Sequence, residues 1–317
     1  MSFRRSLRWF FWLLGLIVGL VTAIAFAFAK RLVNPPRIPL WATPGDLGLD
    51  YDEIQFPAQD GVRISGWFVP AAADSTRKGA TIVLIHGWPW NRLGEVADDL
   101  FSELTGRKPV DLLRLAFSLH QDGYNVLMYD MRNHGESAAA PPIAFGQEEA
   151  KDLLGALAYL NVRSDVDSAR IGVIGFSMGA NSLLYALPQT DKISAGIAVQ
   201  PMTVSVYSQR YGRDLLGLLS TAVLPLSEFM FQVAGGLYFS AYRPSFAAAG
   251  AGNTPVLFIQ GNGDPWGDAE DVAQMAEATP NSRGPLFVEA STRFEGYQYL
   301  IDNPMIATAF FEQELPE

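Results

Sequence analysis

The stretch Arg170-Ile171-Gly172-Val173-Ile174-Gly175-Phe176-Ser177-Met178-Gly179 decides the fold. A short apolar run passes directly into the pattern G-x-S-x-G, which is typical of a sharp turn from a strand into a helix that presents a serine hydroxyl. Glycine is needed at both ends of this pattern because the strained turn leaves no room for side chains. The pattern predicts that Ser177 is a nucleophile. The alternative is an ordinary glycine-rich turn with a surface serine.

Composition limits the chemistry of the chain. Its 317 residues, 49% of them apolar, are enough for one large core or two modest ones. The absence of cysteine excludes disulfides, thiolate nucleophiles and thiolate metal sites, and three histidines leave little material for an imidazole site. We therefore expect no metal and no cofactor. Residues 1–31 carry five basic and no acidic side chains, so the net charge of −10 leaves −15 on the remainder, which disfavours nucleic acid as a partner.

The N-terminal segment differs from the rest of the chain. Trp9 to Ala29 is a run of 21 uncharged, mostly apolar residues between Arg8 and Lys30, long enough to span a bilayer. The alternative is a cleaved signal peptide, because Ala25-Phe26-Ala27-Phe28-Ala29 contains two small-x-small patterns. The apolar run exceeds the roughly 7–15 residues of a signal-peptide core, which favours a retained anchor over residues 1–31.

Basic residues flank this anchor on both sides in nearly equal number. Three arginines and the terminal amine precede it, and Lys30, Arg31 and Arg37 follow. The balance favours an N-terminus inside the cell. We expect a single-pass membrane protein whose folded domain lies outside the cytoplasm.

The chain beyond the anchor divides into a linker and one domain. Residues 32–49 are proline-rich and non-periodic, which predicts an extended tether, and residues 50–317 form the domain. Two β-rich stretches, Tyr51 to Phe56 and Val62 to Val69, are joined by Gln59-Asp60-Gly61, a sequence that favours a hairpin turn.

The rest of the domain alternates short apolar strands with helical segments, the pattern of a mostly parallel sheet buried on both faces. The predicted strands are Thr81 to Ile85, Asn125 to Tyr129, Ile171 to Ile174, Ile193 to Val199, Val256 to Ile259 and Leu286 to Val288. The helical candidates include Gln147 to Leu160, Met178 to Leu187 and Asp268 to Ala278.

One interval breaks this alternation. Residues 203–250 separate two strands by far more than a usual connection, so we interpret them as a helical lid. Leu215 to Phe239 is apolar enough to suggest a second membrane helix. A single crossing there would place strands of one sheet on opposite sides of the membrane, which argues for the lid.

Four motifs in order carry a resemblance to a known family. They are His86-Gly87-Trp88, Asp130-Met131-Arg132-Asn133-His134-Gly135-Glu136-Ser137, Gly175-Phe176-Ser177-Met178-Gly179 and Gly261-Asn262-Gly263-Asp264. The chain resembles the α/β-hydrolase superfamily over about residues 50 to 315, and is most similar to its bacterial, membrane-anchored serine-peptidase or esterase branch. The resemblance implies an α/β-hydrolase fold: a mostly parallel sheet with antiparallel N-terminal strands, helices on both faces and a lid.

The resemblance also assigns roles. Ser177 is then the nucleophile, the backbone N–H groups of Trp88 and Met178 form the oxyanion hole, and Asp264 is the triad carboxylate. The alternative for Asp264 is a turn aspartate before Pro265.

The triad histidine is missing. The family pattern expects it after the last strand, where the chain has Arg293 or Phe294 within Arg293-Phe294-Glu295-Gly296-Tyr297, a match to the spacing H-x-x-G-Y. Arginine stays protonated and phenylalanine has no titratable group, so neither is a general base. His134 is the one substitute at the same sheet edge, and we expect it instead to bond its own loop.

Two functions remain open. One is a membrane-anchored serine hydrolase of acyl esters or peptides that uses Ser177 with an unconventional base. The other is a catalytically impaired relative that binds an apolar ligand or a protein partner. In both cases the expected partners are a hydrophobic acyl or peptide-like small molecule and the membrane.

Overall fold

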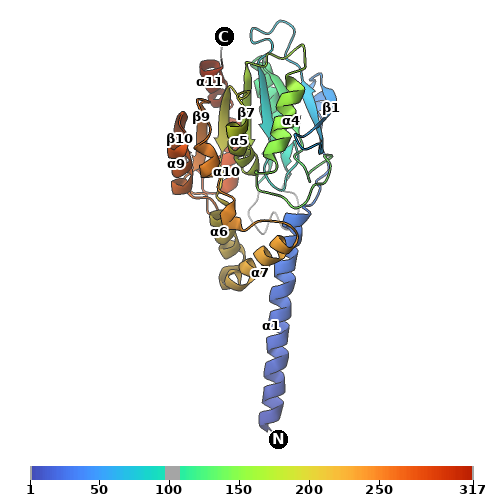
Figure 1. The fold of residues 1–317 in the computed structure, drawn as a ribbon, viewed down its shortest axis with the longest axis vertical. Helices are drawn as coiled ribbons and strands as arrows, with labels where there is room; N and C mark the ends of the chain where they lie inside the picture. Colours follow the sequence, from blue (N-terminus) through green and yellow to red (C-terminus); the bar gives the residue numbers. More distant parts are fainter. Residues whose placement is uncertain (1, 97–107, 316–317) are drawn as a thin grey trace.

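The domain is built on one mixed sheet. A computed structural model describes residues 2–96 and 108–315, and in this part of the chain eight strands form the order β1-β2-β6-β3-β7-β8-β9-β10 (Figure 1). The strands are β1 (Asp52–Pro57), β2 (Arg63–Val69), β3 (Thr81–Ile85), β6 (Asn125–Tyr129), β7 (Ile171–Phe176), β8 (Ala195–Val199), β9 (Val256–Gly261) and β10 (Ser282–Val288). Two short strands, β4 (Gly94–Glu95) and β5 (Val110–Asp111), pair separately.

The pairing confirms the predicted α/β architecture. The first two strands form an antiparallel hairpin, and β2 also pairs antiparallel with β6. All other neighbours in the large sheet are parallel. Strand β7, which leads to Ser177, lies between β3 and β8 and is fully buried, as expected for a parallel strand covered on both faces.

Helices cover both faces of the sheet (Figure 1). One core includes residues of α4, α5, α8 and α9, and the other includes residues of α3, α10 and α11. The helices are α1 (Ser2–Val33), α3 (Leu112–Gln121), α4 (Ala150–Leu160), α5 (Met178–Ala186), α6 (Val204–Leu216), α7 (Ser220–Val233), α8 (Pro244–Ala248), α9 (Ala269–Ala278), α10 (Arg293–Asp302) and α11 (Met305–Glu314). Within the described residues, four 3₁₀ turns accompany them: η1 (Pro44–Leu47), η2 (Leu187–Gln189), η3 (Gly217–Leu219) and η4 (Phe239–Ala241).

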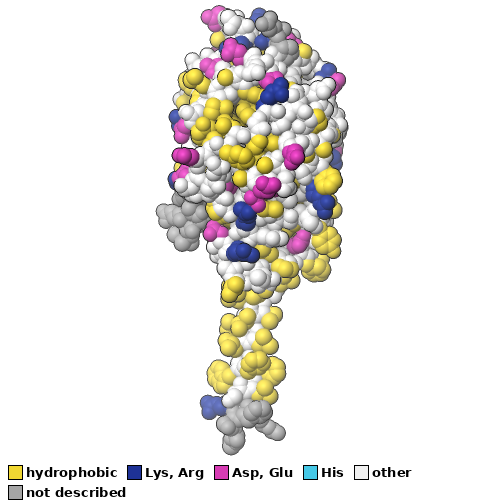
Figure 2. Space-filling model, turned by 90° about the vertical axis from the view of Figure 1, so that its left-hand side faces the viewer, with side chains coloured by type: hydrophobic (Ala, Val, Ile, Leu, Met, Phe, Trp, Pro, Cys, Tyr) yellow, Lys and Arg dark blue, Asp and Glu magenta, His cyan; other side chains and the backbone are white. Residues whose placement is uncertain are grey.

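Helix α1 projects from the domain as a stem (Figure 1). Residues 5–20 are exposed along it, and the space-filling view shows mainly apolar side chains on the stem (Figure 2). The helix is long and apolar enough to cross a membrane. Its last turns differ from the rest because Ala25 and Ala29 are buried and this part of the helix packs against α7.

The segment after α1 lies against the domain. It was predicted to be an extended tether, and apart from η1 it has no regular structure. Arg37 Nη1 nevertheless donates hydrogen bonds to the carbonyl oxygens of Gly135 and Ser137, both at 2.7 Å, and Asn91 Nδ2 donates to the Ile38 carbonyl at 3.1 Å. These contacts fix where α1 meets the domain.

Residues 203–250 form a helical insertion made of α6, η3, α7, η4 and α8. Gly217 ends α6 with a φ of 56°, so the apolar segment Val204–Val233 is divided into two helices that pack against each other. The strands on either side of the insertion, β8 and β9, are paired neighbours. A single membrane crossing between these two strands is incompatible with this pairing.

Candidate active site

Ser177 occupies a strained turn between β7 and α5. Its φ of 54° and ψ of −112° lie outside the regions that non-glycine residues usually adopt, and its N–H donates to the Val199 carbonyl at 2.9 Å. A Cβ on Gly175 would lie 2.3 Å from the Gly179 carbonyl oxygen, and one on Gly179 would lie 2.4 Å from that of Ile85. Both glycines of the pattern are therefore required by backbone contact.

The surroundings of Ser177 suit a developing negative charge. The serine immediately precedes α5, so it lies at the positive end of that helix dipole. In the described part of the chain, neither the Trp88 nor the Met178 backbone N–H donates a hydrogen bond to another protein group. The two amides assigned to the oxyanion hole are thus available to a ligand.

Asp264 follows β9 and is buried. Its Oδ1 accepts from the Trp266 backbone N–H at 2.9 Å, and its Oδ2 accepts from Gln260 Nε2 at 3.3 Å. These donors orient the carboxylate. The same Oδ2 accepts a charge-assisted bond from Arg293 Nη1 at 2.5 Å.

Arg293 joins the predicted acid to the predicted nucleophile. Its Nη2 donates to Ser177 Oγ at 3.3 Å and to the Gln200 carbonyl at 2.7 Å. Nη1 and Nη2 of the guanidinium are bridged by one carbon, as the two ring nitrogens of histidine are. Arginine thus makes both of the contacts that a triad histidine would make, but it donates at each end.

The charge of Arg293 is held in place by its neighbours. Burial opposes this charge, but attraction to Tyr297 and Asp264 outweighs burial and raises the pKa of Arg293 above its usual value. The guanidinium carbon also lies 5.3 Å from the ring centres of Tyr207 and Tyr297. Arg293 is the first residue of α10, where the helix dipole disfavours a cation, so Asp264 is the decisive stabilising contact.

Gln200 is a residue of the site that the sequence analysis missed. Its carbonyl accepts from Arg293 Nη2, and its Nε2 donates to the backbone carbonyl of the same arginine. A Cβ on Gly296 would lie 2.6 Å from the Gln200 amide, which explains why the residue three positions after Arg293 is glycine. A polar residue directly after the apolar strand β8 was the available signal.

Phe294 lies away from Ser177. Its ring packs edge-on against Trp266 and Tyr297, with centroids 5.9 Å and 6.1 Å away, inside the core that contains α10. Of the two positions considered for the missing base, the structure brings only Arg293 to the serine.

His134 is buried beside His86, and it makes no described hydrogen bond to Ser177. Its Nδ1 bonds the Arg132 carbonyl at 2.9 Å, within its own loop. Burial and, to a smaller extent, the neighbouring His86 together lower the pKa of His134 to about 3. His86 is also structural, because its Nε2 accepts from the Met131 backbone N–H at 3.0 Å.

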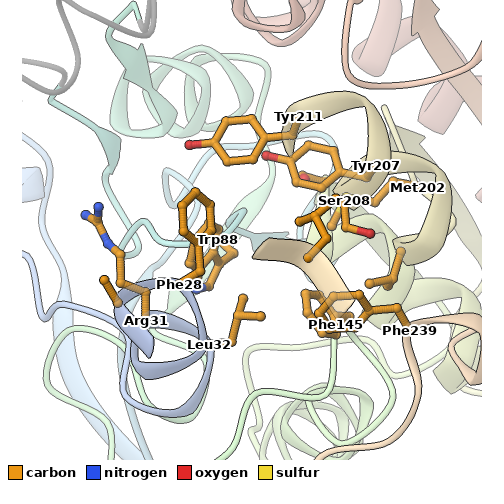
Figure 3. A pocket seen from close by; sticks show the side chains of 14 residues that line it. Phe28, Arg31, Leu32, Trp88, Phe145, Met202, Tyr207, Ser208, Tyr211 and Phe239 are labelled. Atoms are coloured by element: carbon orange, nitrogen blue, oxygen red, sulfur yellow. The ribbon is translucent and has the colours of Figure 1, made fainter. Parts of the chain in front are cut away.

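A cavity of about 220 Å³ opens next to Ser177. Figure 3 shows Phe28 and Leu32 of α1 on one side, facing Tyr207 and Ser208 of α6, whereas Arg31 directs its guanidinium away from them. Further lining comes from the domain and the insertion, including Trp88, Phe145, Met202, Leu224 and Phe239. The walls are largely apolar, with Ser177 among the few polar groups.

A strained G-x-S-x-G turn after a central parallel strand, a buried aspartate after β9 and a helical insertion are typical of hydrolases built on an α/β sheet. The family model "Alpha/beta hydrolase family" matches residues 82–310. The chain therefore belongs to the alpha/beta hydrolase family, which confirms the resemblance described above.

Individual relatives agree with this assignment. The chain is 30% identical to the alpha/beta hydrolase domain-containing protein WAV2 of Arabidopsis thaliana over 78% of this chain and 74% of the relative. It is 29% identical to YqkD of Bacillus subtilis over 84% of this chain and 82% of that relative. Among solved structures, the Pyrococcus furiosus esterase PF2001 is 25% identical, with a TM-score of 0.67, over 90% of this chain and 99% of that one.

Proposed function

We propose that this protein binds an apolar acyl group next to Ser177 and does not hydrolyse it at an appreciable rate. The observation that carries the proposal is the contact of Arg293 with both Asp264 and Ser177. A histidine at this point would accept the serine proton as the hydroxyl attacks. A guanidinium has no free lone pair for a proton, and here its pKa is raised further.

The loss of the base is large on the energy scale of catalysis. Removing the histidine of a serine triad costs about a millionfold in turnover, or roughly 8 kcal/mol. The oxyanion hole and substrate binding alone leave about a thousandfold acceleration over water. This residual rate acceleration is too small for a working hydrolase.

The cavity supports an acyl ligand. Its walls come mainly from aromatic and aliphatic side chains, and Ser177 and Trp88 are among its lining residues. In the described part of the chain, the backbone amides of Trp88 and Met178 donate no hydrogen bond to another protein group. Those amides suit a carbonyl oxygen. A hydrophobic chain ending in a carbonyl, carboxylate or ester therefore matches the site better than a sugar-like ligand.

We extend the proposal to the membrane. Helix α1 has the length and composition of a single-pass anchor, and its side chains 5–20 are exposed. The insertion 203–250 acts as a lid, since α6 and α7 contribute walls of the cavity over Ser177. The domain then lies outside the cytoplasm, as the charge balance around α1 favours.

A second function has one specific observation in its favour. The strained backbone of Ser177 and its two free neighbouring amides are present as a hydrolase needs them. Hydrolysis of acyl esters or peptides through Ser177 is therefore the alternative, with a base other than histidine.

The two functions are separated by measuring binding and reaction on the same sample. Full-length protein in detergent is titrated with decanoate by calorimetry and is treated in parallel with a fluorophosphonate probe. We expect saturable binding, retained in Ser177→Ala, and no labelling of Ser177 within the time that labels an active serine esterase. Rapid labelling at Ser177 together with ester turnover would overturn the proposal in favour of the hydrolase.

A further inference from the structure

The cavity beside Ser177 is closed on one side by the stem helix. Ala27, Phe28, Arg31 and Leu32 of α1 line it, and Phe28 meets the Tyr211 ring of α6 edge-on at 6.5 Å. The Leu32 carbonyl also accepts from the Ile143 backbone N–H at 3.1 Å. The last turns of α1 are therefore a fixed part of the candidate site.

The position of these turns along α1 sets their depth in a membrane. The apolar run of 21 residues from Trp9 to Ala29 is about 31 Å long at the helical rise, close to the roughly 30 Å of a hydrocarbon core. A helix that spans with this run places Ala27 and Phe28 in its final turn, at the edge of the hydrocarbon. The mouth of the cavity then lies at that edge too.

The surface of the insertion also supports a cavity mouth at the edge of the hydrocarbon. The insertion exposes large apolar side chains that a water-facing surface would not favour: Leu218, Phe229, Val233, Leu237 and Tyr238. Helix α7, which carries Phe229 and Val233, packs against α1 below the sheet domain (Figure 1). The single acidic residue of the segment 215–239, Glu228, is bonded to the Phe239 backbone N–H at 2.6 Å.

We infer that the cavity takes one acyl chain of a bilayer lipid, which enters from the membrane beside the last turns of α1. This inference rests on the proposed function, because it names the source of the acyl group that the site binds. The volume limits how much of the chain is enclosed. A cavity of about 150 Å³ holds a benzene ring, so 220 Å³ holds on the order of nine carbon atoms, and the rest of the chain stays in the bilayer.

A photoreactive lipid tests the inference. The full-length protein is placed in phosphatidylcholine nanodiscs that contain a phosphatidylcholine with a diazirine near the end of one acyl chain. After irradiation, adducts are mapped by mass spectrometry. Adducts on residues 9–20 report insertion of α1. We expect additional adducts on residues 204–211 of α6, which line the cavity.

A matched pair of variants makes the test specific. Ser208→Trp fills the cavity from α6, whereas Gln209→Trp places the same ring on the exposed neighbouring position. We expect the α6 adducts to fall at least fivefold in Ser208→Trp and to persist in Gln209→Trp. Adducts confined to residues 9–20, or α6 adducts unchanged in Ser208→Trp, would refute the inference.

A second probe separates the inference from the proposed function. A diazirine derivative of decanoate is added from water to the protein in detergent. Labelling of α6 by this acid, without labelling by the bilayer lipid, would leave the binding function intact and refute the membrane source. Labelling of α6 by neither probe would count against both the proposed binding function and the membrane source of the acyl chain.

Discussion

Replacing Arg293 by histidine is expected to give Ser177 a general base. The substitution places an imidazole where the guanidinium now bridges the acid and the serine. Asp264 keeps its bonds from Trp266 and Gln260, so it remains oriented to accept from the new ring. The imidazole can then take the serine proton, which the arginine cannot.

The expected gain follows from the geometry. A well-placed histidine is worth about a millionfold in turnover. Histidine is shorter than arginine, and even the present donor lies 3.3 Å from Ser177 Oγ, so a misplacement of about 1 Å is expected and costs roughly a hundredfold. We therefore expect kcat/KM to rise by about ten-thousandfold over the wild type, or roughly 5.4 kcal/mol.

The assay is hydrolysis of p-nitrophenyl octanoate by the full-length protein in detergent. Phe294→His is the matched control, because it adds the same ring one residue later, in the core and away from Ser177. Its activity should stay at the wild-type level. Adding Ser177→Ala to Arg293→His should abolish the gain.

Two results would refute the reasoning. One is an Arg293→His variant that keeps its thermal stability and decanoate binding yet shows no gain. The other is robust wild-type turnover that disappears in His134→Ala, which would make His134 the base.

Three further predictions concern the fold around the site. Burial holds the pKa of His134 near 3 in the folded state, against about 6.5 in the unfolded state, so between pH 6 and 4 only the unfolded state binds this proton and the free energy of unfolding decreases as the pH is lowered. In thermal or urea unfolding, the wild type should lose about 1.4 kcal/mol per pH unit more than His134→Asn, and equal slopes for the two proteins would contradict this. Gly179→Ala should cost about 3 kcal/mol of stability, because its Cβ would lie 2.4 Å from a carbonyl oxygen of β3, whereas Gly45→Ala, with contacts of 3.5 Å, should be tolerated; similar melting temperatures of the two variants would count against the elbow geometry. Ala25→Leu should lower stability by about 1–3 kcal/mol through overpacking, while exposed Ala23→Leu should not, and an unaffected Ala25→Leu would mean that α1 is not docked.

The fold could be predicted because its signals are local. The turn at Ser177 needs glycines within two residues, and the apolar strands β3 and β6 have the bounds that their hydrophobic runs predict. Other boundaries were less visible. Strand β10 begins at Ser282, four residues before the predicted Leu286, because its first half is polar and only partly buried. Helix α1 continues to Val33 because its last turns pack on the domain.

The site was only partly predictable. The H-x-x-G-Y spacing pointed to Arg293, but its reach to both Ser177 and Asp264 depends on three strands meeting at one sheet edge. The role of α1 in the cavity had no sequence signal at all. An apolar residue such as Phe28 has the same character whether it faces lipid or lines a cavity, and more than 140 residues separate it from Ser177.

The presence of Asp264 is not by itself evidence for catalysis. A buried guanidinium without a partner costs about 3–5 kcal/mol, so a chain with Arg293 at this point needs a carboxylate beside it for stability alone. Under the proposed function, Ser177 is likewise explained as a polar lining residue of the acyl-binding cavity. Under the proposed function, arginine in place of the triad histidine therefore gives a fixed ion pair with Asp264 instead of a proton relay, and the cavity with its wall from α1 serves for binding.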